Sequence, residues 1–302
     1  MGEICTALRC TPGGILKFGP DSEQEDESMD GILKKIRLSD AFNKENRVPF
    51  VKAIVLMSLF TFTFLGAEFL FVNMVSRTVS GNQSVASQNY ALGVSAVGFV
   101  LYPLFCRVCK GKVQSAVSLG AAMVSVGCLF LICRHSTYAL TLGMGLVLFL
   151  LLGAFGSAVF YKALCLLEDN TYTARLVGTS YMLGVLLQIA NNNLIHTDIL
   201  EAVILSVFIL LLAVMLIRAE KSSIVPAFSK DAPQEETEKI GRSSMKIGII
   251  LALFVAMMTC IFSTLDNAVT LYHASGEVNI GQWARVLLAL SGVLAGFLFD
   301  TA

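Results

Sequence analysis

Long apolar segments separated by short polar stretches constrain the fold of this chain more than any other feature. A helix of about 20 apolar residues crosses the hydrocarbon core of a bilayer, which is roughly 30 Å thick. Segments of this kind occupy residues 51–73, 90–105, 113–133, 138–161, 176–194, 200–217, 247–271 and 283–302. The sequence therefore predicts an all-α, polytopic membrane helix bundle with about eight transmembrane helices.

Composition agrees with a membrane protein and leaves little room for an enzyme. The chain has 302 residues, of which 55% are hydrophobic and 15% are charged. Its mean hydropathy of +0.72 lies in the range of polytopic membrane proteins. The pair Cys106-x-x-Cys109 has metal-ligand spacing, but no second Cys or His pair stands near it in sequence, and we find no nucleophile elbow or P-loop motif. We therefore expect no enzymatic activity, no metal and no cofactor.

The distribution of basic residues predicts the orientation of the chain. With the N-terminus in the cytosol, all but three of the 22 lysine and arginine residues lie on the inner side. The exceptions are Arg77, Arg134 and Arg285. Because cytoplasmic loops carry an excess of Lys and Arg, we expect a multi-pass protein of the plasma membrane with both termini in the cytosol.

Polar segments divide the chain into regions. Residues 1–50 are predicted to form a cytosolic, disordered tail, and residues 218–246 a solvated cytosolic linker. Between the spans, residues 76–89 are expected to form an outer loop and residues 162–175 a cytosolic loop. Neither loop is long enough to form a separate domain.

Two acidic residues in the predicted spans are candidates for an ion or substrate pathway. Glu68 lies two thirds of the way along the first span, and Asp266 stands beside Asn267 near the outer end of the seventh. A charge at a helix centre costs roughly 2.5 kcal/mol or more, so Glu68 should face the bundle interior or a cavity. It either carries a proton or forms an ion pair, for which Arg285 of the eighth span is the possible partner.

The fifth span is the most polar. Tyr181, Gln188 and Asn192 recur at intervals of seven and four, which puts them on one helical face. Such a face must meet other helices, a substrate or water, and the pattern favours cavity lining and an interhelical hydrogen-bond ladder equally. Val185 and Ile189 are expected on a different face.

An internal repeat indicates a duplication. Shifting the chain by about 194 positions places like residues opposite one another without a gap. The pairs include Lys52 with Lys246, Asn73 with Asn267, and Gly98 with Gly292. Internal repeats are typical of secondary transporters.

A short motif at the end of the eighth span carries a family resemblance. The residues Gly296-x-Leu298-x-Asp300 resemble the opening of the Gly-x-Leu-x-Asp-Arg-x-Gly-Arg-Arg loop of the major facilitator superfamily, with Thr301 in place of the first Arg. After the second span, the corresponding loop keeps basic residues and has Cys106 where the acid is expected. The basic residues of that loop are Arg107, Lys110 and Lys112.

The resemblance implies an architecture. Residues 51–217 would form a six-helix half, and residues 247–302 the first two helices of a second half that ends after the eighth helix. In that family the first and seventh helices line a central cavity, and an embedded acid often carries the coupled proton. Glu68 and Asp266 fit the role of that acid, and Asn73 and Asn267 are further candidates for the pathway.

The sequence thus predicts a secondary active transporter of an unidentified small molecule, with or without coupling to protons. One alternative is the membrane-embedded sensor half of a helix-turn-helix transcriptional regulator. Another is a non-functional fragment of a twelve-helix transporter. The expected partners are the lipid bilayer, a small-molecule substrate and, in the coupled case, protons, with no nucleic acid bound by this part of the chain.

Overall fold

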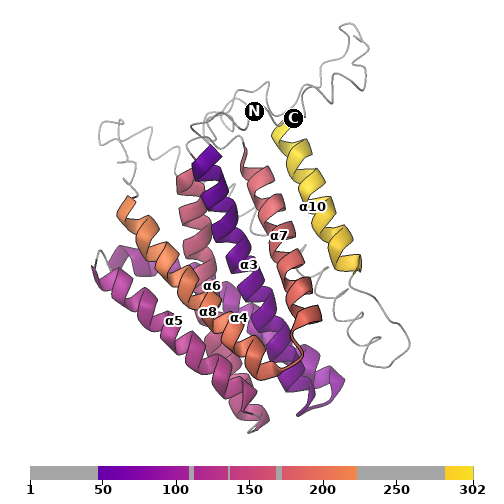
Figure 1. The fold of residues 1–302 in the computed structure, drawn as a ribbon. Coiled ribbons are helices and arrows are strands. Elements are labelled where there is room, and N and C mark those ends of the chain that lie inside the picture. The colour runs from indigo at the N-terminus through magenta and orange to yellow at the C-terminus, as the bar shows by residue number, and fades with distance from the viewer. Residues whose placement is uncertain (1–46, 109–111, 135–136, 168–171, 223–282, 302) are drawn as a thin grey trace, which may run out of the picture. The chain divides into compact units, whose positions relative to one another are not determined.

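The computed structural model describes residues 47–108, 112–134, 137–167, 172–222 and 283–301, which form seven α-helices (Figure 1). In chain order these are α3 (Arg47–Ser76), α4 (Gly81–Val108), α5 (Lys112–Cys133), α6 (Tyr138–Leu166), α7 (Thr173–Leu194), α8 (Asp198–Ser222) and α10 (Trp283–Thr301). The prediction of an all-helical bundle is confirmed for this part of the chain. The predicted seventh span, most of the tail and most of the linker lie outside the described residues.

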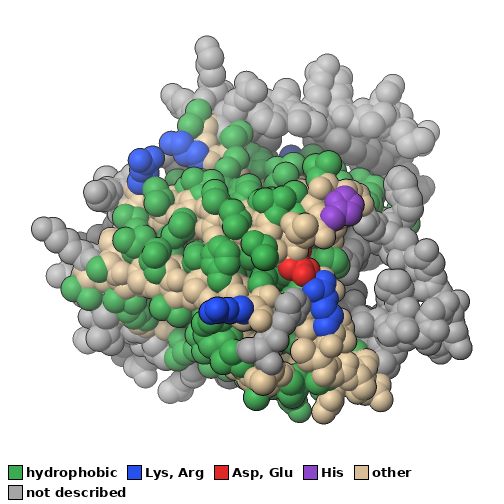
Figure 2. Space-filling model, turned by 60° about the horizontal axis from the view of Figure 1, so that its bottom comes forward, with side chains coloured by type: hydrophobic (Ala, Val, Ile, Leu, Met, Phe, Trp, Pro, Cys, Tyr) green, Lys and Arg blue, Asp and Glu red, His purple; other side chains and the backbone are tan. Residues whose placement is uncertain are grey.

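The outer surfaces of the bundle suit a lipid environment. Among the described residues, four helices are long and apolar enough to cross a membrane: α3, α5, α6 and α8. On α8, Val203, Val207 and Leu211 recur every four residues and are exposed. Hydrophobic side chains predominate on the face drawn in Figure 2, and charged ones are few. An apolar surface of this extent is costly in water and favourable in a bilayer.

Two predicted loops prove to be largely helical. Helix α4 begins at Gly81, so most of the expected outer loop 76–89 is part of that helix. The expected cytosolic loop 162–175 is wrong at both ends, because α6 continues to Leu166 and α7 begins at Thr173. Hydropathy treats polar residues as exposed to water, whereas Gln88, Lys162 and Arg175 are buried in the bundle.

Short connections fix the direction of successive helices. Thr137 caps α6, and its hydroxyl oxygen accepts a hydrogen bond from the backbone nitrogen of Leu140 at 3.4 Å. Only three residues separate α7 from α8, which opens with acidic residues in its first turn. Acidic side chains there oppose the positive end of the helix dipole. Successive helices are therefore antiparallel, and Asp198 marks the end of the bundle where α3, α5 and α7 finish; we call it the Asp198 end.

Helices α3 and α6 form the centre of the apolar core. The rings of Phe64 and Phe71 of α3 meet the ring of Phe149 of α6 edge-on, with centroids 5.5 and 5.7 Å apart. Phe149 and Leu152 are fully buried. Edge-to-face ring pairs add to the stabilisation from burial.

The packing of the six helices repeats after three. Helices α3, α4 and α5 correspond to α6, α7 and α8, respectively. Under this correspondence the packed pair α4–α6 matches α7–α3, the pair α5–α6 matches α8–α3, and the pair α6–α8 matches α3–α5. The pairs α3–α6 and α5–α8 map onto themselves. The contact of α3 with α4 has no counterpart of similar extent between α6 and α7, and α4 packs more extensively on α6 than α7 does on α3. Because each unit has three helices and α3 is antiparallel to α6, the second unit is inverted relative to the first.

Glycines allow the two matching helix crossings. A Cβ atom added to Gly98 of α4 would collide with the carbonyl group of Leu150 in α6. At the matching crossing, a Cβ atom added to Gly184 of α7 would lie 2.6 Å from the Cβ atom of Thr61 in α3. Small residues at helix contacts let backbones approach closely. The same device therefore holds both crossings.

Candidate functional site

The membrane-embedded carboxylate of Glu68 meets an amide from the next helix. Glu68 lies in α3, about 12 Å along the helix from its last residue, Ser76. One of its carboxylate oxygens accepts a hydrogen bond of 2.7 Å from Nε2 of Gln88 in α4. Glu68 is partly buried, and Gln88 is buried. The site therefore joins an acid and an amide between two helices of the first three-helix unit.

Gln88 was not among the predicted site residues, because it was expected in an outer loop. In the structure it lies in α4, seven positions after the first helical residue, Gly81. One signal was available: an embedded acid needs a hydrogen-bond donor, and Gln88 is an amide-bearing residue near the start of the next span. Glu68 had been paired with Arg285 as an alternative, and the Arg285 side chain lies outside the described residues.

A second polar pair lies on α7. Gln188 is 3% exposed, and its Nε2 atom donates a hydrogen bond of 2.7 Å to Oδ1 of Asn192. Its Oε1 atom has no hydrogen-bond partner among the described residues. This side chain packs on α3, where a Cβ atom added to Gly66 would lie 2.9 Å from Oε1. Gln188 thus faces the protein interior with an unused acceptor.

The expected difference between the faces of α7 is wrong for Val185. Val185 is 4% exposed and therefore as buried as Gln188. The reason is the helical period: Val185 is four residues from Tyr181, about 40° further round the helix, so the two share a face. Tyr181 is partly buried and lines a groove between α7 and α10.

The two polar pairs do not form one cluster. Gly66, which Gln188 covers, and Glu68 are two residues apart in α3, so they point about 200° apart around the helix. The structure thus brings Gln88 to Glu68 on one side of α3 and places Gln188 with Asn192 on the other. Both pairs lie in the part of the bundle nearer the Asp198 end.

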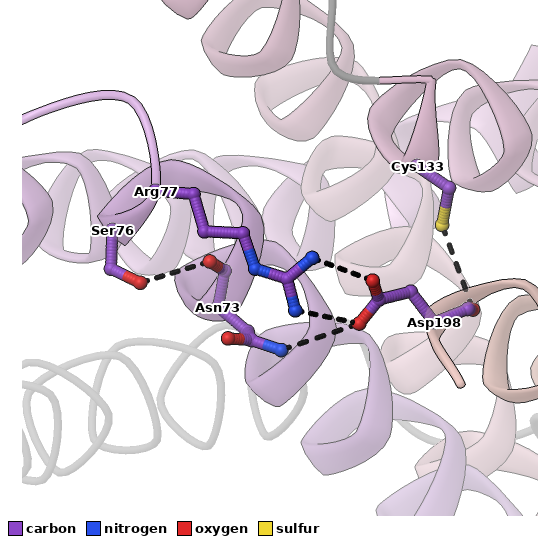
Figure 3. Close-up of polar contacts among 5 residues, drawn as sticks. All are labelled: Asn73, Ser76, Arg77, Cys133 and Asp198. Carbon is purple, nitrogen blue, oxygen red and sulfur yellow. Dashed lines mark hydrogen bonds and ion pairs between the residues drawn. The ribbon is translucent and has the colours of Figure 1, made fainter. Parts of the chain in front are cut away.

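An ion pair at the Asp198 end joins the two three-helix units (Figure 3). The guanidinium group of Arg77, just after α3, donates hydrogen bonds of 2.6 and 3.0 Å to the two carboxylate oxygens of Asp198. Nδ2 of Asn73, a predicted pathway residue, lies 3.4 Å from Oδ1 of Asp198. The Cys133 thiol at the end of α5 points to the backbone oxygen of Asp198, 3.7 Å away.

This bidentate pair favours the charged form of Arg77. The hydrogen bond to Asp198 raises the pKa of Arg77 above its ordinary value, so the arginine stays charged at every working pH. The side chains of Arg77 and Asp198 are 43% and 24% exposed. Asp198 was not predicted as a site residue, because an acid at the first position of a span is ordinary in sequence.

A second acid lies one turn further along α8. Glu201 is 6% exposed, and one of its oxygens lies 3.5 Å from Nδ2 of Asn191 in α7. Like Asp198, Glu201 was not predicted as a site residue. Within the described ranges, no group of three or more His, Cys, Asp or Glu side chains gathers as a metal site would require.

Helix α10 contacts α7 through small residues. A Cβ atom added to Gly296 would lie 2.6 Å from the carbonyl oxygen of Ala174, and one added to Gly178 would collide with the backbone of Gly292. Arg175, expected in a loop, is 7% exposed, and its guanidinium carbon lies 4.9 Å from the ring centre of Phe297. The position of Gly296 is therefore that of a helix-contact residue, and not that of a loop residue.

The structure does not describe the side chains of the other predicted site residues. Asp266 and Asn267 of the pathway set and Lys110 of the motif-like loop lie outside the described residues. Arg107 lies in the last turn of α4, Lys112 is the first residue of α5, and Asp300 lies in α10. All three are therefore helical, although a loop had been expected there.

Comparison of the chain with protein-family models, with curated proteins and with solved structures finds no match. What the polar pairs do must therefore be inferred from their chemistry and from the packing around them.

Proposed function

We propose that this chain is a secondary active transporter of a small molecule in the plasma membrane, of the kind found in the major facilitator superfamily, with both termini cytosolic. One observation carries the proposal: the inverted relation between the units α3–α5 and α6–α8. Inverted-topology repeats are a recurring feature of secondary transporters, in which substrate and ion sites lie at the repeat interface. Here α3 and α6 form that interface.

We further propose that Glu68 couples transport to protons. An embedded carboxylate is costly, and its presence in a membrane helix is a sign of function. Its amide partner can serve both protonation states, because Gln88 can donate through its nitrogen to the carboxylate and accept through its oxygen from the carboxylic acid. An arginine partner would favour only the ionised form.

The contact between α7 and α10 supports movement between units. Helices α7 and α10 meet at glycines, where their backbones approach closely. Because glycines have no side chains to interlock, few side-chain contacts must be broken when one helix shifts along the other. Rocking of one bundle against another around a fixed site is the general mechanism of alternating access. In this proposal α7 belongs to the first half of the transporter and α10 to the second.

The test uses the full chain in proteoliposomes that contain a pH-sensitive dye. A panel of amino acids, sugars, nucleosides and organic cations is added outside at acidic pH. We expect at least one compound to drive proton influx with the wild-type protein and none to do so with Glu68→Gln. Exchange of that compound, radiolabelled and without a gradient, should survive in Glu68→Gln, because the shape of the side chain is kept.

Asp198→Asn is the matched control, since it also removes one carboxylate but at the exposed ion pair. It should keep compound-driven proton influx. Undiminished gradient-driven uptake by Glu68→Gln would refute the coupling role. The absence of both influx and exchange for every compound would count against the transporter itself.

A further inference from the structure

A cavity separate from the polar pairs lies between α4, α5, α6 and α8. Its volume is about 190 Å³, roughly six times the share of one water in the liquid. Its lining is almost wholly apolar and includes Leu101, Phe105, Val117, Leu151, Phe155 and Leu216. Apolar cavities of this size stay dry and accept apolar groups.

One cation lines this cavity. Lys162 of α6 is 8% exposed, so more than nine tenths of its surface is buried. Among the described residues no carboxylate lies within ion-pair distance of Lys162. Its Nζ atom lies 5.9 Å from the centre of the Tyr161 ring. Lysine is almost never buried without a partner. A lysine whose side chain is mostly buried, beside an apolar space, suits an anion with an apolar body.

The position of the cavity indicates where that anion comes from. Lys162 lies one helical turn before Leu166, the last residue of α6, and so near one end of the bundle. Leu101 and Val117 line the cavity and are 45% and 44% exposed on the outside of the bundle. The cavity can therefore be entered from the surface that faces lipid.

The surrounding charge is also suitable. Ile217 of α8 lines the cavity, and the next residue, Arg218, is exposed. Arg107 at the end of α4 and Lys112 at the start of α5 belong to the same end of the bundle. Basic pockets between transmembrane helices on the cytoplasmic side bind anionic lipid head groups, and this is the end predicted to be cytosolic.

We propose that this cavity binds one acyl chain of an anionic membrane phospholipid, with the lipid phosphate on the Lys162 ammonium. The phosphate supplies a counter-ion that the described residues do not provide for Lys162, and the acyl chain fills the space lined by Phe155 and Val117. A phospholipid fits better than a free fatty acid, because Arg218 is a further, exposed cation at this end of the bundle. The inference does not depend on the transport proposal.

Native mass spectrometry of the purified full chain, with added phosphatidylglycerol, phosphatidylcholine or oleate, tests the site. We expect wild-type protein to retain phosphatidylglycerol in preference to the other two. Lys162→Met keeps the length and apolarity of the stem and should weaken phosphatidylglycerol binding by about ten- to a hundredfold, the range expected for a hydrogen bond to a charged group. Lys162→Arg should retain most of the binding.

Lys52→Met is the control, because Lys52 is an exposed lysine in the first turns of α3, at the same end of the bundle. It should bind phosphatidylglycerol as the wild type does. Equal binding by Lys162→Met and wild type would overturn the proposal. So would equal retention of phosphatidylcholine, or tighter retention of oleate, which would assign the cavity to an uncharged head group or to a fatty acid.

Discussion

The units α3–α5 and α6–α8 pack alike and differ in their polar content. In each unit the middle helix crosses the first helix of the other unit at a glycine, Gly98 in α4 and Gly184 in α7. In the first unit the embedded polar pair is Glu68 with Gln88, and in the second it is Gln188 with Asn192. The second unit also has a carboxylate between its own helices, because Nδ2 of Asn191 in α7 lies 3.5 Å from an oxygen of Glu201, but that acid lies in the first turn of α8.

The polar positions do not follow the packing symmetry. Gln88 precedes its crossing glycine, Gly98, by ten residues, whereas Gln188 follows Gly184 by four. Backbone approach at a crossing demands small residues, and both crossings have a glycine. Polar side chains are costly in lipid and are placed where they function. The helix packing is therefore shared by the two units, whereas the positions of the polar pairs are not.

The largest expected effect concerns the crossings. Gly98→Ala places a methyl group against the α6 backbone and should destabilise the protein by about 2 kcal/mol, as overpacking typically does. Gly184→Ala should act in the same direction but less, because it meets the side chain of Thr61 first. Thermal unfolding in detergent, followed with a thiol-reactive dye, measures both.

Gly93→Ala, in the same helix as Gly98, is the control. An added Cβ there has no neighbour within 4 Å, and alanine favours helix over glycine by about 1 kcal/mol. Its unfolding temperature should be unchanged or raised. If Gly98→Ala is no less stable than Gly93→Ala, the close crossing does not exist, and the likeness of the two units fails with it.

The next largest effect tests whether Gln88 supports Glu68 in the first unit. Gln88→Leu removes a hydrogen bond to a charged group, a loss of roughly 1.5–3 kcal/mol, and should slow gradient-driven transport about tenfold in the proteoliposome assay. Gln83→Leu, an exposed glutamine earlier in α4, should leave the rate unchanged. A rate independent of Gln88 would show that the amide does not serve Glu68.

A smaller effect separates the two interpretations of the polar face on α7. Gln188→Met keeps the side-chain length and removes an acceptor that has no partner, so stability should hold within about 1 kcal/mol. If Gln188 lines a substrate path, uptake falls severalfold, which is what we expect. Unchanged uptake with lowered stability would favour the hydrogen-bond ladder. Leu187→Met, at an exposed neighbour, is the control.

The smallest effect is expected for the ion pair that joins the two units. Arg77→Met breaks the ion pair with Asp198, but both side chains retain water contact, so the cost should stay below about 1 kcal/mol. The difference from wild type should shrink in 1 M salt, where the Debye length falls to about 3 Å. A large, salt-independent loss of stability would mean that this link, and not the crossings, holds the units together.

Sequence alone was sufficient to place most of the helices. The predicted span 113–133 differs from helix α5 by one residue, and 138–161 differs from α6 only at its C-terminal end. Their positions follow from bilayer thickness and from runs of apolar residues, which are local properties of the chain. Glu68 and Gln188 were also visible in sequence, because a polar residue inside an apolar run stands out.

Only the tertiary structure identified the partners. Arg77 and Asp198 are separated by 121 positions, and Glu68 and Gln88 by 20, so no local pattern joins them. Lys162 and Arg175 have the composition of loop residues, yet they are buried by neighbouring helices. The hydropathy of a residue sets what it costs in lipid, whereas its neighbours decide whether that cost is offset. The bilayer therefore determined where the helices run, and packing between distant helices decided which polar groups meet.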